Sequence, residues 1–326
     1  MKTLRWILWP FSILYGSIME IRNFLFRKRI LKSVEFDVPV ISVGNLAVGG
    51  TGKTPMVKYL IEALSDDYKI GVLSRGYGRR TKGFLEVSET GTASDCGDEP
   101  LEIKQHSPQT IVAVCEDRVV GIPQLLNLDP EVNLVILDDA FQHQYVKPSV
   151  SIVLSIYDQP FFSDFVMPMG RLREFRKNID RADLLVFTKS PHGYKAYSGL
   201  SKPTYYARTT ADQLQLVYGD ERMLSSALAV SGLANNQRFA QQIKQTLTNV
   251  ETLSFSDHHR YTTKDVLRMV NRSEELDYVI VTTNKDWVKL KPIFEELGAD
   301  VSVFVQSVRF EIEGEVELLA RIKEKL

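Results

Sequence analysis

A glycine-rich stretch followed by a lysine and a threonine contains the residues of this chain best suited to chemistry. It covers residues 43–55 and reads VGNLAVGGTGKTP. Glycines let backbone N–H groups turn toward a phosphate, and a helix that begins at the lysine adds the positive end of its dipole. Lys53 could reach the outer phosphates of a nucleotide, and Thr54 could ligate a divalent cation. The stretch therefore predicts a phosphate-binding loop.

The segments on either side of this loop are the ones that such a loop requires. An apolar, β-branched run at residues 38–43 predicts a buried strand, and an apolar-periodic helix follows the loop. The P-loop pattern G-x-x-x-x-G-K-[ST] asks for glycine where this chain has Ala47. We interpret the motif as a diverged P-loop, the alternative being a glycine-rich turn without a ligand. The predicted nucleotide-binding residues are Val48, Gly49, Gly50, Thr51, Gly52, Lys53, Thr54 and Pro55.

Two further stretches contain paired carboxylates. Asp138 and Asp139 end an apolar strand at residues 133–137, where an acidic side chain could face Mg²⁺ together with Thr54. Adjacent side chains on a strand point to opposite sides, so only one of the two aspartates is expected to ligate the metal directly, and which one stays open. Asp98 and Glu99 in the GDEP stretch are a candidate general base and polar anchor. The alternatives are a helix cap for the first pair and ion pairs with arginines for the second.

Several basic residues could meet phosphate. The turn MPMGRLRE at residues 167–174 contains Arg171, and Arg75 and Arg118 follow two other predicted strands. Each could equally be a solvated or structural arginine. His258 lies in the run SDHHRY, where a neighbouring aspartate could orient its imidazole. Nothing in the local sequence indicates whether this run reaches the P-loop, and a surface loop is the alternative.

The overall composition limits the function classes. The chain has 326 residues, more than one hydrophobic core usually covers, which favours two domains. A net charge of −1 gives no basic field for nucleic acid, so we expect no nucleic-acid partner. Cys96 and Cys115 have no metal-binding spacing and form no disulfide framework.

Short buried strands alternate with helical segments along the chain, which predicts parallel βαβ units in a doubly wound sheet. In such sheets ligands bind at the carboxyl ends of strands, where most of the polar clusters above lie. Near residue 205 the pattern starts again, which predicts a second, smaller α/β unit with the substrate site in the cleft between the two. The expected fold is an α/β, mostly parallel P-loop sheet with a smaller α/β domain and an N-terminal membrane-associated helix. The expected strands are residues 38–43, 69–74, 111–115, 133–137, 150–155, 184–188, 213–218, 227–231, 278–283 and 301–306.

The N-terminal segment is a candidate for contact with a membrane. Residues 6–19 are uncharged, which is short of the ~20 residues that a straight transmembrane helix needs. Tryptophan and tyrosine within the segment, and basic residues on both sides of it, are typical of a helix that lies in the interface of an anionic bilayer. The alternatives are a helix packed on the protein's own core and a signal peptide. The expected domains are residues 1–26 for this helix, 27–205 for the P-loop core and 206–326 for the smaller α/β domain.

Taken together, these motifs resemble one family. The chain resembles the tetraacyldisaccharide 4′-kinases, the lipid A 4′-kinases of Gram-negative bacteria, and the similarity extends from residue 43 to about residue 290. The motifs that carry it, in chain order, are VGNLAVGGTGKTP, LSRGYGRR, GDEP, the Asp117-Arg118 pair, ILDDAFQH, MPMGRLRE, LVFTK, SGLANNQRF, FSDHHRY and TTNKDWVKL.

The resemblance implies a membrane-associated enzyme with ATP and Mg²⁺ as cofactors. It would phosphorylate the 4′-hydroxyl of lipid A disaccharide 1-phosphate to form lipid IVA, at the cytoplasmic face of the inner membrane. Asp98 and His258 would activate the hydroxyl. Asp138, Asp139, Thr54 and Lys53 would hold Mg²⁺ and nucleotide, and Gln142 would assist them. Arg171 would lie near the transferred phosphoryl group and Glu99 near the disaccharide or the metal, and the residues Glu99, Arg75, Arg118, Gln142 and His143 would form the substrate site.

Two other functions remain as alternatives. One is a P-loop nucleotide switch docked on a membrane, favoured by Thr188-Lys189 at a predicted strand end, although a guanine-reading motif would need an aspartate where Pro191 stands. The other is a soluble small-molecule kinase or ligase whose N-terminal helix is merely packed.

Overall fold

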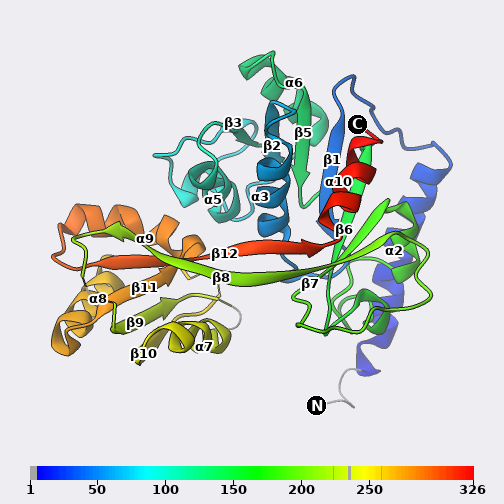
Figure 1. Ribbon diagram of the computed structural model, residues 1–326. Coiled ribbons are helices and arrows are strands. Elements are labelled where there is room, and N and C mark those ends of the chain that lie inside the picture. The colour runs from blue at the N-terminus through cyan, green and yellow to red at the C-terminus, as the bar shows by residue number, and fades with distance from the viewer. Residues whose placement is uncertain (1–5, 223, 234–235, 258) are drawn as a thin grey trace.

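A single twelve-stranded sheet runs through the described part of the protein (Figure 1). The computed structural model describes residues 6–222, 224–233, 236–257 and 259–326. The strand order is β10-β9-β11-β12-β8-β7-β6-β1-β5-β2-β4-β3. The strand order reverses on either side of β1, as expected for a doubly wound sheet. The predicted α/β class and mostly parallel sheet are confirmed.

The P-loop strand lies at the centre of the first half of this sheet. All six residues of β1 are buried, and it pairs in parallel with β5 and β6. In this register Val43 lies opposite Asp138, so the start of the glycine loop and the acidic strand end lie at the same edge. The predicted strands of this half are present, and the short antiparallel edge strand β3 is an addition. Their bounds are β1 Val40–Asn45, β2 Ile70–Ser74, β3 Leu85–Glu86, β4 Ile111–Val114, β5 Leu134–Asp138, β6 Val150–Ile156 and β7 Leu184–Thr188.

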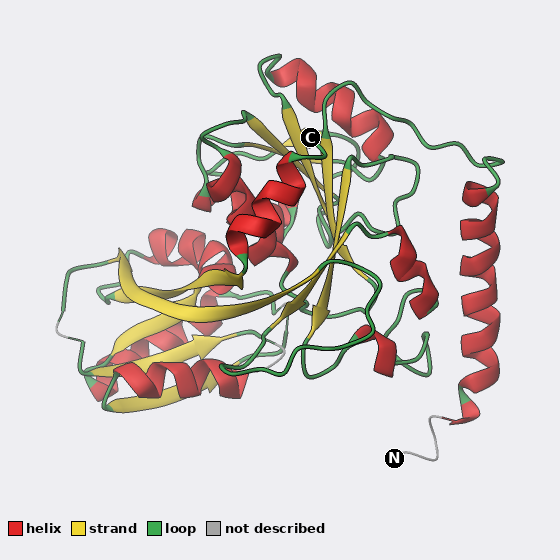
Figure 2. Cartoon of the chain, turned by 45° about the vertical axis from the view of Figure 1, so that its right-hand side comes forward, coloured by secondary structure: helices red, strands yellow, loops and turns green. Residues whose placement is uncertain are grey.

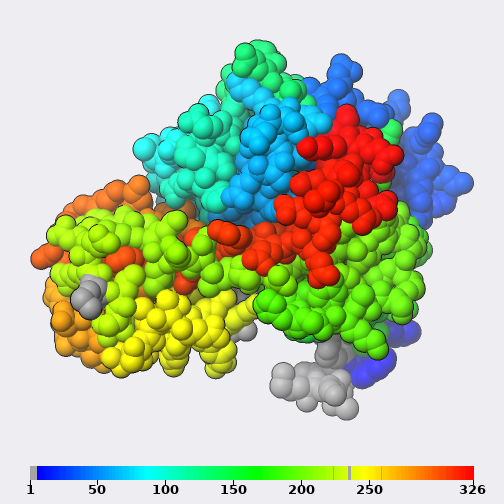
Figure 3. Space-filling model, viewed as in Figure 1, coloured from blue at the N-terminus to red at the C-terminus, as the bar shows by residue number. Residues whose placement is uncertain are grey.

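Helices cover both faces of this half. Leu60 of α3, Leu101 of α5 and Leu318 of α10 belong to one apolar cluster on one face, whereas Ile122 and Leu125 of α6 pack in a second cluster. The C-terminal helix α10 thus returns to the first half, where Figure 3 shows it in red beside the blue of α3. The bounds are α3 Lys53–Leu64, α4 Ala93–Cys96, α5 Asp98–His106, α6 Arg118–Leu128 and α10 Glu315–Lys323, with 3-10 helices η1 Phe161–Ser163 and η2 Arg176–Arg181.

Two long antiparallel strands, β8 and β12, connect the halves of the sheet. β8 also pairs with β7, and β12 pairs with β11, so the hydrogen-bonded sheet is continuous. The predicted strand 213–218 is only a part of β8, the predicted strand 301–306 begins two residues before β12 and covers only its first residues, and β10 was not predicted. Helix α7 packs on one face of the second half and α8 and α9 on the other. The bounds are β8 Thr204–Tyr218, β9 Ser226–Ser231, α7 Asn236–Thr246, β10 Asn249–Ser254, α8 Thr263–Leu276, β11 Val279–Thr283, α9 Asn284–Leu297 and β12 Val303–Glu313.

Helix α2, Trp9–Arg27, runs along one side of the first half (Figure 2). Its buried residues are Ser12, Gly16, Asn23 and Phe26. A Cβ at Gly16 would lie 2.5 Å from the ring of Phe175, so the glycine allows the helix to approach closely. The rest of the helix exposes large apolar side chains. No helix in the described part of the chain combines the length and the hydropathy needed to cross a bilayer.

Candidate active site

The glycine loop joins β1 directly to α3. Gly52 has a φ of 88° and begins the helix, in a conformation that disfavours side chains with a Cβ. A Cβ added at Gly49 or Gly50 would meet no atom of the described residues within 4 Å, so the loop is open on that side. Pro55 lies in the first turn, where its missing N–H leaves no hydrogen bond unmade. The loop therefore has the form of an anion site at a helix N-terminus.

Side chains from two other strands hold the loop in place. The Thr188 hydroxyl at the end of β7 donates to the Thr51 carbonyl at 2.8 Å, and Lys189 donates to the Gly50 carbonyl at 2.8 Å. Asn45 at the end of β1 donates to the Thr51 hydroxyl at 2.6 Å. The Thr188-Lys189 pair thus contacts the phosphate loop itself in this structure.

The two aspartates after β5 have opposite electrostatic environments. Asp138 is buried and accepts a hydrogen bond from the Ser74 hydroxyl at 3.0 Å. Its other oxygen, Oδ1, is buried without a hydrogen-bond partner among the described residues. Burial, together with the charge of neighbouring Asp139, raises the pKa of Asp138 from 3.8 to about 6. A buried carboxylate oxygen without a partner, at the same sheet edge as the P-loop, suits a Mg²⁺ site.

Asp139 is held between two cations. The Lys53 ammonium lies 3.7 Å from its Oδ1, and the Arg173 guanidinium donates to both of its oxygens at 3.0 and 3.3 Å. Burial acts to raise the pKa of Asp139, but the charges of Lys53 and Arg173 outweigh it and hold that pKa below 3.8. Asp139 has a φ of 47°, so the chain turns sharply where the strand ends. The contact between Lys53 and Asp139 therefore connects the P-loop to the acidic end of β5.

Of the two arginines in the turn at residues 167–174, the structure brings Arg173 to this carboxylate. Arg171 instead donates to Asp164 at 2.8 Å and to Gln159. The backbone of this segment pairs with the P-loop, because the Val48 amide donates to the Arg171 carbonyl at 2.9 Å. Arg173 was missed as a site residue by sequence reasoning. The only signal for it was the presence of two arginines in one turn.

A buried polar network connects α2 to the segment after Asp139. Glu174 is fully buried and accepts from Arg181 at 2.8 and 2.9 Å, from Gln142 at 3.1 Å and from Asn23 at 2.7 Å. Gln142 also accepts from Arg173 at 3.2 Å. The sequence-predicted Gln142 is therefore fixed by a helix remote in sequence. Asn23 and Glu174 were not predicted as site residues; Glu174 ends the MPMGRLRE turn, whereas no motif includes Asn23.

His143, a predicted substrate residue, is held neutral. Burial lowers its pKa to about 4, and the positive charge of Arg118 acts in the same direction. Its Nε2 is buried without a hydrogen-bond partner in the described part of the chain. A neutral imidazole with an unpaired nitrogen could accept from, or donate to, a hydroxyl of a bound ligand.

This pKa gives a prediction for stability. Lowering the pH from 7.5 to 5 is expected to reduce the free energy of unfolding of both the wild type and His143→Asn. We expect the reduction to be about 2 kcal/mol larger in the wild type. The folded protein keeps this histidine neutral down to about pH 4, whereas the unfolded chain protonates it near its ordinary 6.5, so acid favours unfolding. Urea unfolding at the two pH values measures the difference. His192→Asn, an exposed control, should behave as the wild type, and equal pH dependence in His143→Asn would contradict the prediction.

Arg118 and Arg75 lie close to the same edge. Arg118 is buried, donates to the Asp138 carbonyl at 3.2 Å, and keeps an Nε without a partner among the described residues. Burial lowers the pKa of Arg118. The charge of Asp138 acts to raise that pKa, and the charge of Arg75 acts to lower it further. Arg75 is exposed at the end of β2. The structure therefore places Arg118 at Asp138, and the charges of both predicted arginines reach His143.

Asp98 and Glu99 form the first turn of α5 and approach the site from a third element. Glu99 is near enough for its charge to raise the pKa of Asp138. Asp98 forms an ion pair with Lys289 of α9 at 3.4 Å, so the second half of the chain reaches it. His258 lies outside the described residues, and its position relative to Asp98 stays a prediction. The predicted carboxylates thus gather from β5 and α5, two elements that are separate in sequence.

A cavity of about 820 Å³ lies between the two halves, beyond the first turn of α3. Pro55, Lys58 and Tyr59 line it on the α3 side, with Phe239 and Trp287 opposite. Aromatic and charged side chains together suit a nucleoside. In the described part of the chain no group of three or more His, Cys, Asp and Glu side chains could hold a metal ion. Mg²⁺ in kinases is usually held by one or two carboxylates together with phosphate oxygens, which this site can offer.

Comparison with known proteins agrees with this geometry over the whole chain. A family model described as tetraacyldisaccharide-1-P 4′-kinase matches residues 4–326. The tetraacyldisaccharide 4′-kinase of Cytophaga hutchinsonii is 42% identical over 312 residues, covering 90% of this chain and 88% of that protein. That of Bacteroides fragilis is 38% identical over 337 residues, covering 96% and 89%. A crystal structure of LpxK from Aquifex aeolicus in complex with ATP matches with a TM-score of 0.82 and 33% identity, covering 99% of each chain. The chain belongs to the tetraacyldisaccharide-1-phosphate 4′-kinase family.

Proposed function

We propose that this protein transfers the γ-phosphoryl group of ATP to the 4′-hydroxyl of a tetraacyldisaccharide 1-phosphate, the step that forms lipid IVA in lipid A biosynthesis. The observation that carries the proposal is the contact of Lys53 with Asp139 at the P-loop, with Asp98 arriving from a separate helix. Family membership agrees with it, because the relatives are kinases that act on a hydroxyl group.

The nucleotide phosphates would lie in the loop at residues 48–55, with Lys53 at the outer phosphates and the nucleoside in the 820 Å³ cavity. The unpartnered Oδ1 of Asp138 fits a Mg²⁺ ion, and the Thr54 hydroxyl and Asp139 are proposed to complete its set of ligands. When bound, Mg²⁺ supplies a positive charge that stabilises the phosphates during transfer. Arg173, already held at Asp139, supplies a fixed charge at the same place.

Asp98 is proposed as the general base that takes the proton of the acceptor hydroxyl, with His258 assisting it. Arg171 is proposed near the transferred phosphoryl group, for which its guanidinium would have to leave Asp164. Glu99, Arg75, Arg118, Gln142 and His143 are proposed to contact the disaccharide. Arg118 and His143 support this role, because each has a buried nitrogen without a partner among the described residues.

The deciding assay uses radiolabelled ATP with lipid A disaccharide 1-phosphate in detergent micelles. We expect label in the lipid product at the 4′ position, and we expect it to depend on Mg²⁺. Folded protein that binds ATP and leaves the lipid unlabelled would overturn the proposed function.

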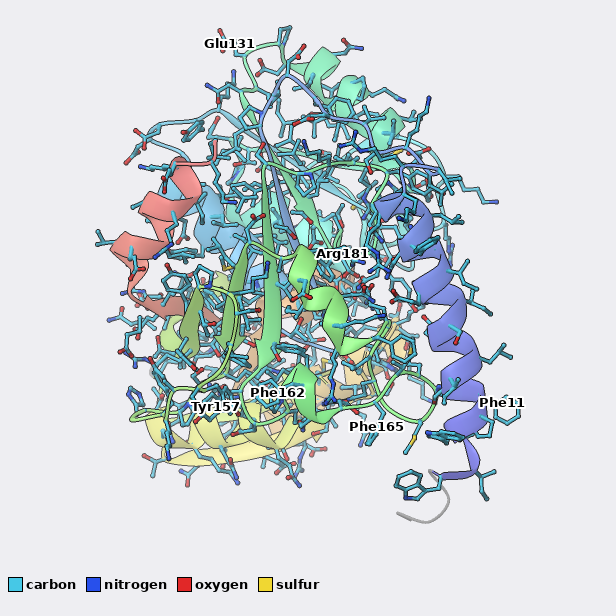
Figure 4. All side chains as sticks on the ribbon, turned by 90° about the vertical axis from the view of Figure 1, so that its right-hand side faces the viewer. Phe11, Glu131, Tyr157, Phe162, Phe165 and Arg181 are labelled. Carbon is cyan, nitrogen blue, oxygen red and sulfur yellow. The ribbon has the colours of Figure 1, made fainter. Side chains whose placement is uncertain are left out.

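We further propose that α2 places the enzyme on the cytoplasmic face of the inner membrane. The side chains of Trp9, Phe11 and Leu14 are 49%, 60% and 62% exposed. Figure 4 shows Phe11 directed away from the body of the protein and Phe165 in the loop beside the same end of the helix. The basic residues Lys28 and Arg29 follow the helix and suit anionic lipid. A lipid substrate makes this location favourable, since each exposed CH₂ group costs about 0.8 kcal/mol in water.

The exposed face of α2 can be tested without disturbing its buried face. Replacing Trp9, Phe11 and Leu14 together by serine should lower binding to phosphatidylethanolamine–phosphatidylglycerol vesicles by about 10-fold or more, because their apolar area no longer enters the bilayer. Vesicle co-sedimentation measures the bound fraction. The control is Val316→Ser, which replaces an exposed apolar side chain on α10. Unchanged co-sedimentation of the triple variant would contradict membrane contact through this face and favour α2 as a helix that only packs on the protein. Deleting the helix is a poorer test, since it also removes Asn23 from Glu174.

A further inference from the structure

Lys289 is the point at which the second half of the chain touches the proposed base. It lies on α9, and its ammonium is 3.4 Å from Oδ2 of Asp98 at the start of α5. Only 9% of the Lys289 side chain and 19% of the Asp98 side chain are exposed. An ion pair so little exposed is screened less by water and salt than a surface pair. The contact therefore has the strength to affect how the Asp98 carboxylate is held.

A second carboxylate, that of Asp286, also contacts the Lys289 ammonium. Asp286 is fully buried, and its Oδ1 lies 3.7 Å from the Lys289 ammonium. The same carboxylate accepts from the Gly232 amide at 3.0 Å, the Tyr261 hydroxyl at 3.0 Å and the Thr283 hydroxyl at 2.8 Å. Asp286 thereby holds together the ends of β9 and β11 and the segment at residues 259–261.

Lys289 is also attached to that segment directly. Its ammonium donates to the His259 carbonyl at 3.3 Å and lies 5.6 Å from the centre of the Tyr261 ring. One cation thus contacts Asp98 in the first half and the segment at residues 259–261 in the second. Arginine would keep the charge with a different shape, whereas methionine would keep the length and lose the charge.

We propose that Lys289 is a positioning residue for phosphoryl transfer. It holds the Asp98 carboxylate at a fixed place relative to the segment at residues 259–261, so that Asp98 can take the proton of the acceptor hydroxyl. This inference rests on the proposed role of Asp98 as base. Lys289 acts through Asp98 and need not contact the phosphates. Its removal is expected to lower kcat, while ATP binding at the P-loop is retained.

The experiment measures kcat and the KM for ATP in micelles for Lys289→Met, Lys289→Arg and the control Lys291→Met, whose lysine lies on the exposed side of the same helix. We expect Lys289→Met to lower kcat by about 10-fold or more, with a change in KM for ATP below about 2-fold. Lys289→Arg should recover most of the loss, and Lys291→Met should match the wild type. An unchanged kcat in Lys289→Met would overturn the inference.

A double-mutant cycle with Asp98→Asn separates positioning from a general loss of structure. If Lys289 acts through Asp98, adding Lys289→Met to Asp98→Asn lowers kcat no further. Multiplying effects would overturn the inference, as would a Lys289→Met protein that no longer binds ATP and is not rescued by arginine. Absence of lipid phosphorylation by the wild type is a different result, since it rejects the proposed function itself.

Discussion

Replacing Asp98 by asparagine is expected to lower kcat for lipid phosphorylation by about 10²-fold or more. The amide keeps the size of the side chain but cannot take a proton from the acceptor hydroxyl. Asp98 lies in the first turn of α5 and pairs with Lys289, so the carboxylate is held at the junction of the two halves. The P-loop contacts described above do not include Asp98, and the KM for ATP should change little.

Initial rates in micelles at saturating ATP measure this change. Asp95→Asn is the matched control, because Asp95 is exposed three residues away on α4 and should keep wild-type kcat. A kcat within 2-fold of the wild type in Asp98→Asn would remove Asp98 from the role of base.

The second large effect is expected for Asp139→Asn, with a loss in kcat of about 10²- to 10³-fold. Asp139 lies between Lys53 and Arg173. A neutral amide would leave these two cations close together without the negative charge that offsets their repulsion. Their repulsion would displace Lys53 from the P-loop or Arg173 from Gln142. Either displacement disturbs charges that must be fixed before the phosphoryl group moves.

This loss is measured as kcat and as the affinity for ATP by calorimetry. Asp66→Asn, exposed beyond the far end of α3, is the control and should leave both unchanged. Wild-type kcat in Asp139→Asn would show that the contact between Lys53 and Asp139 is not used in catalysis. A fall in thermal stability without a fall in kcat would assign the contact to folding alone.

The strands and the glycine loop could be predicted because their signals are local. An apolar β-branched run such as that ending at Val43 encodes a buried strand, and glycines before Lys53 encode a loop with free amides. The second half was harder to delimit. β8 and β12 are long strands whose residues are only partly buried, so only a part of each was predicted, and the buried residues 205–207 of β8 were not part of it. The domain bounds at residues 26 and 205 stay predictions, and the sheet is continuous across the second of them.

By itself the sequence determined the kind of chemistry: a phosphate loop, acidic strand ends and a GDEP carboxylate, each recognisable from neighbours within a few residues. The tertiary structure decided which groups meet. It brought Arg173 to Asp139 while Arg171 pairs with Asp164, and it brought Lys289 to Asp98 across 191 positions of the chain. It also joined Asn23 to Glu174. Such pairs depend on how strands and helices pack, because spacing along the chain sets the face of an element on which a side chain lies but not which other element that face meets.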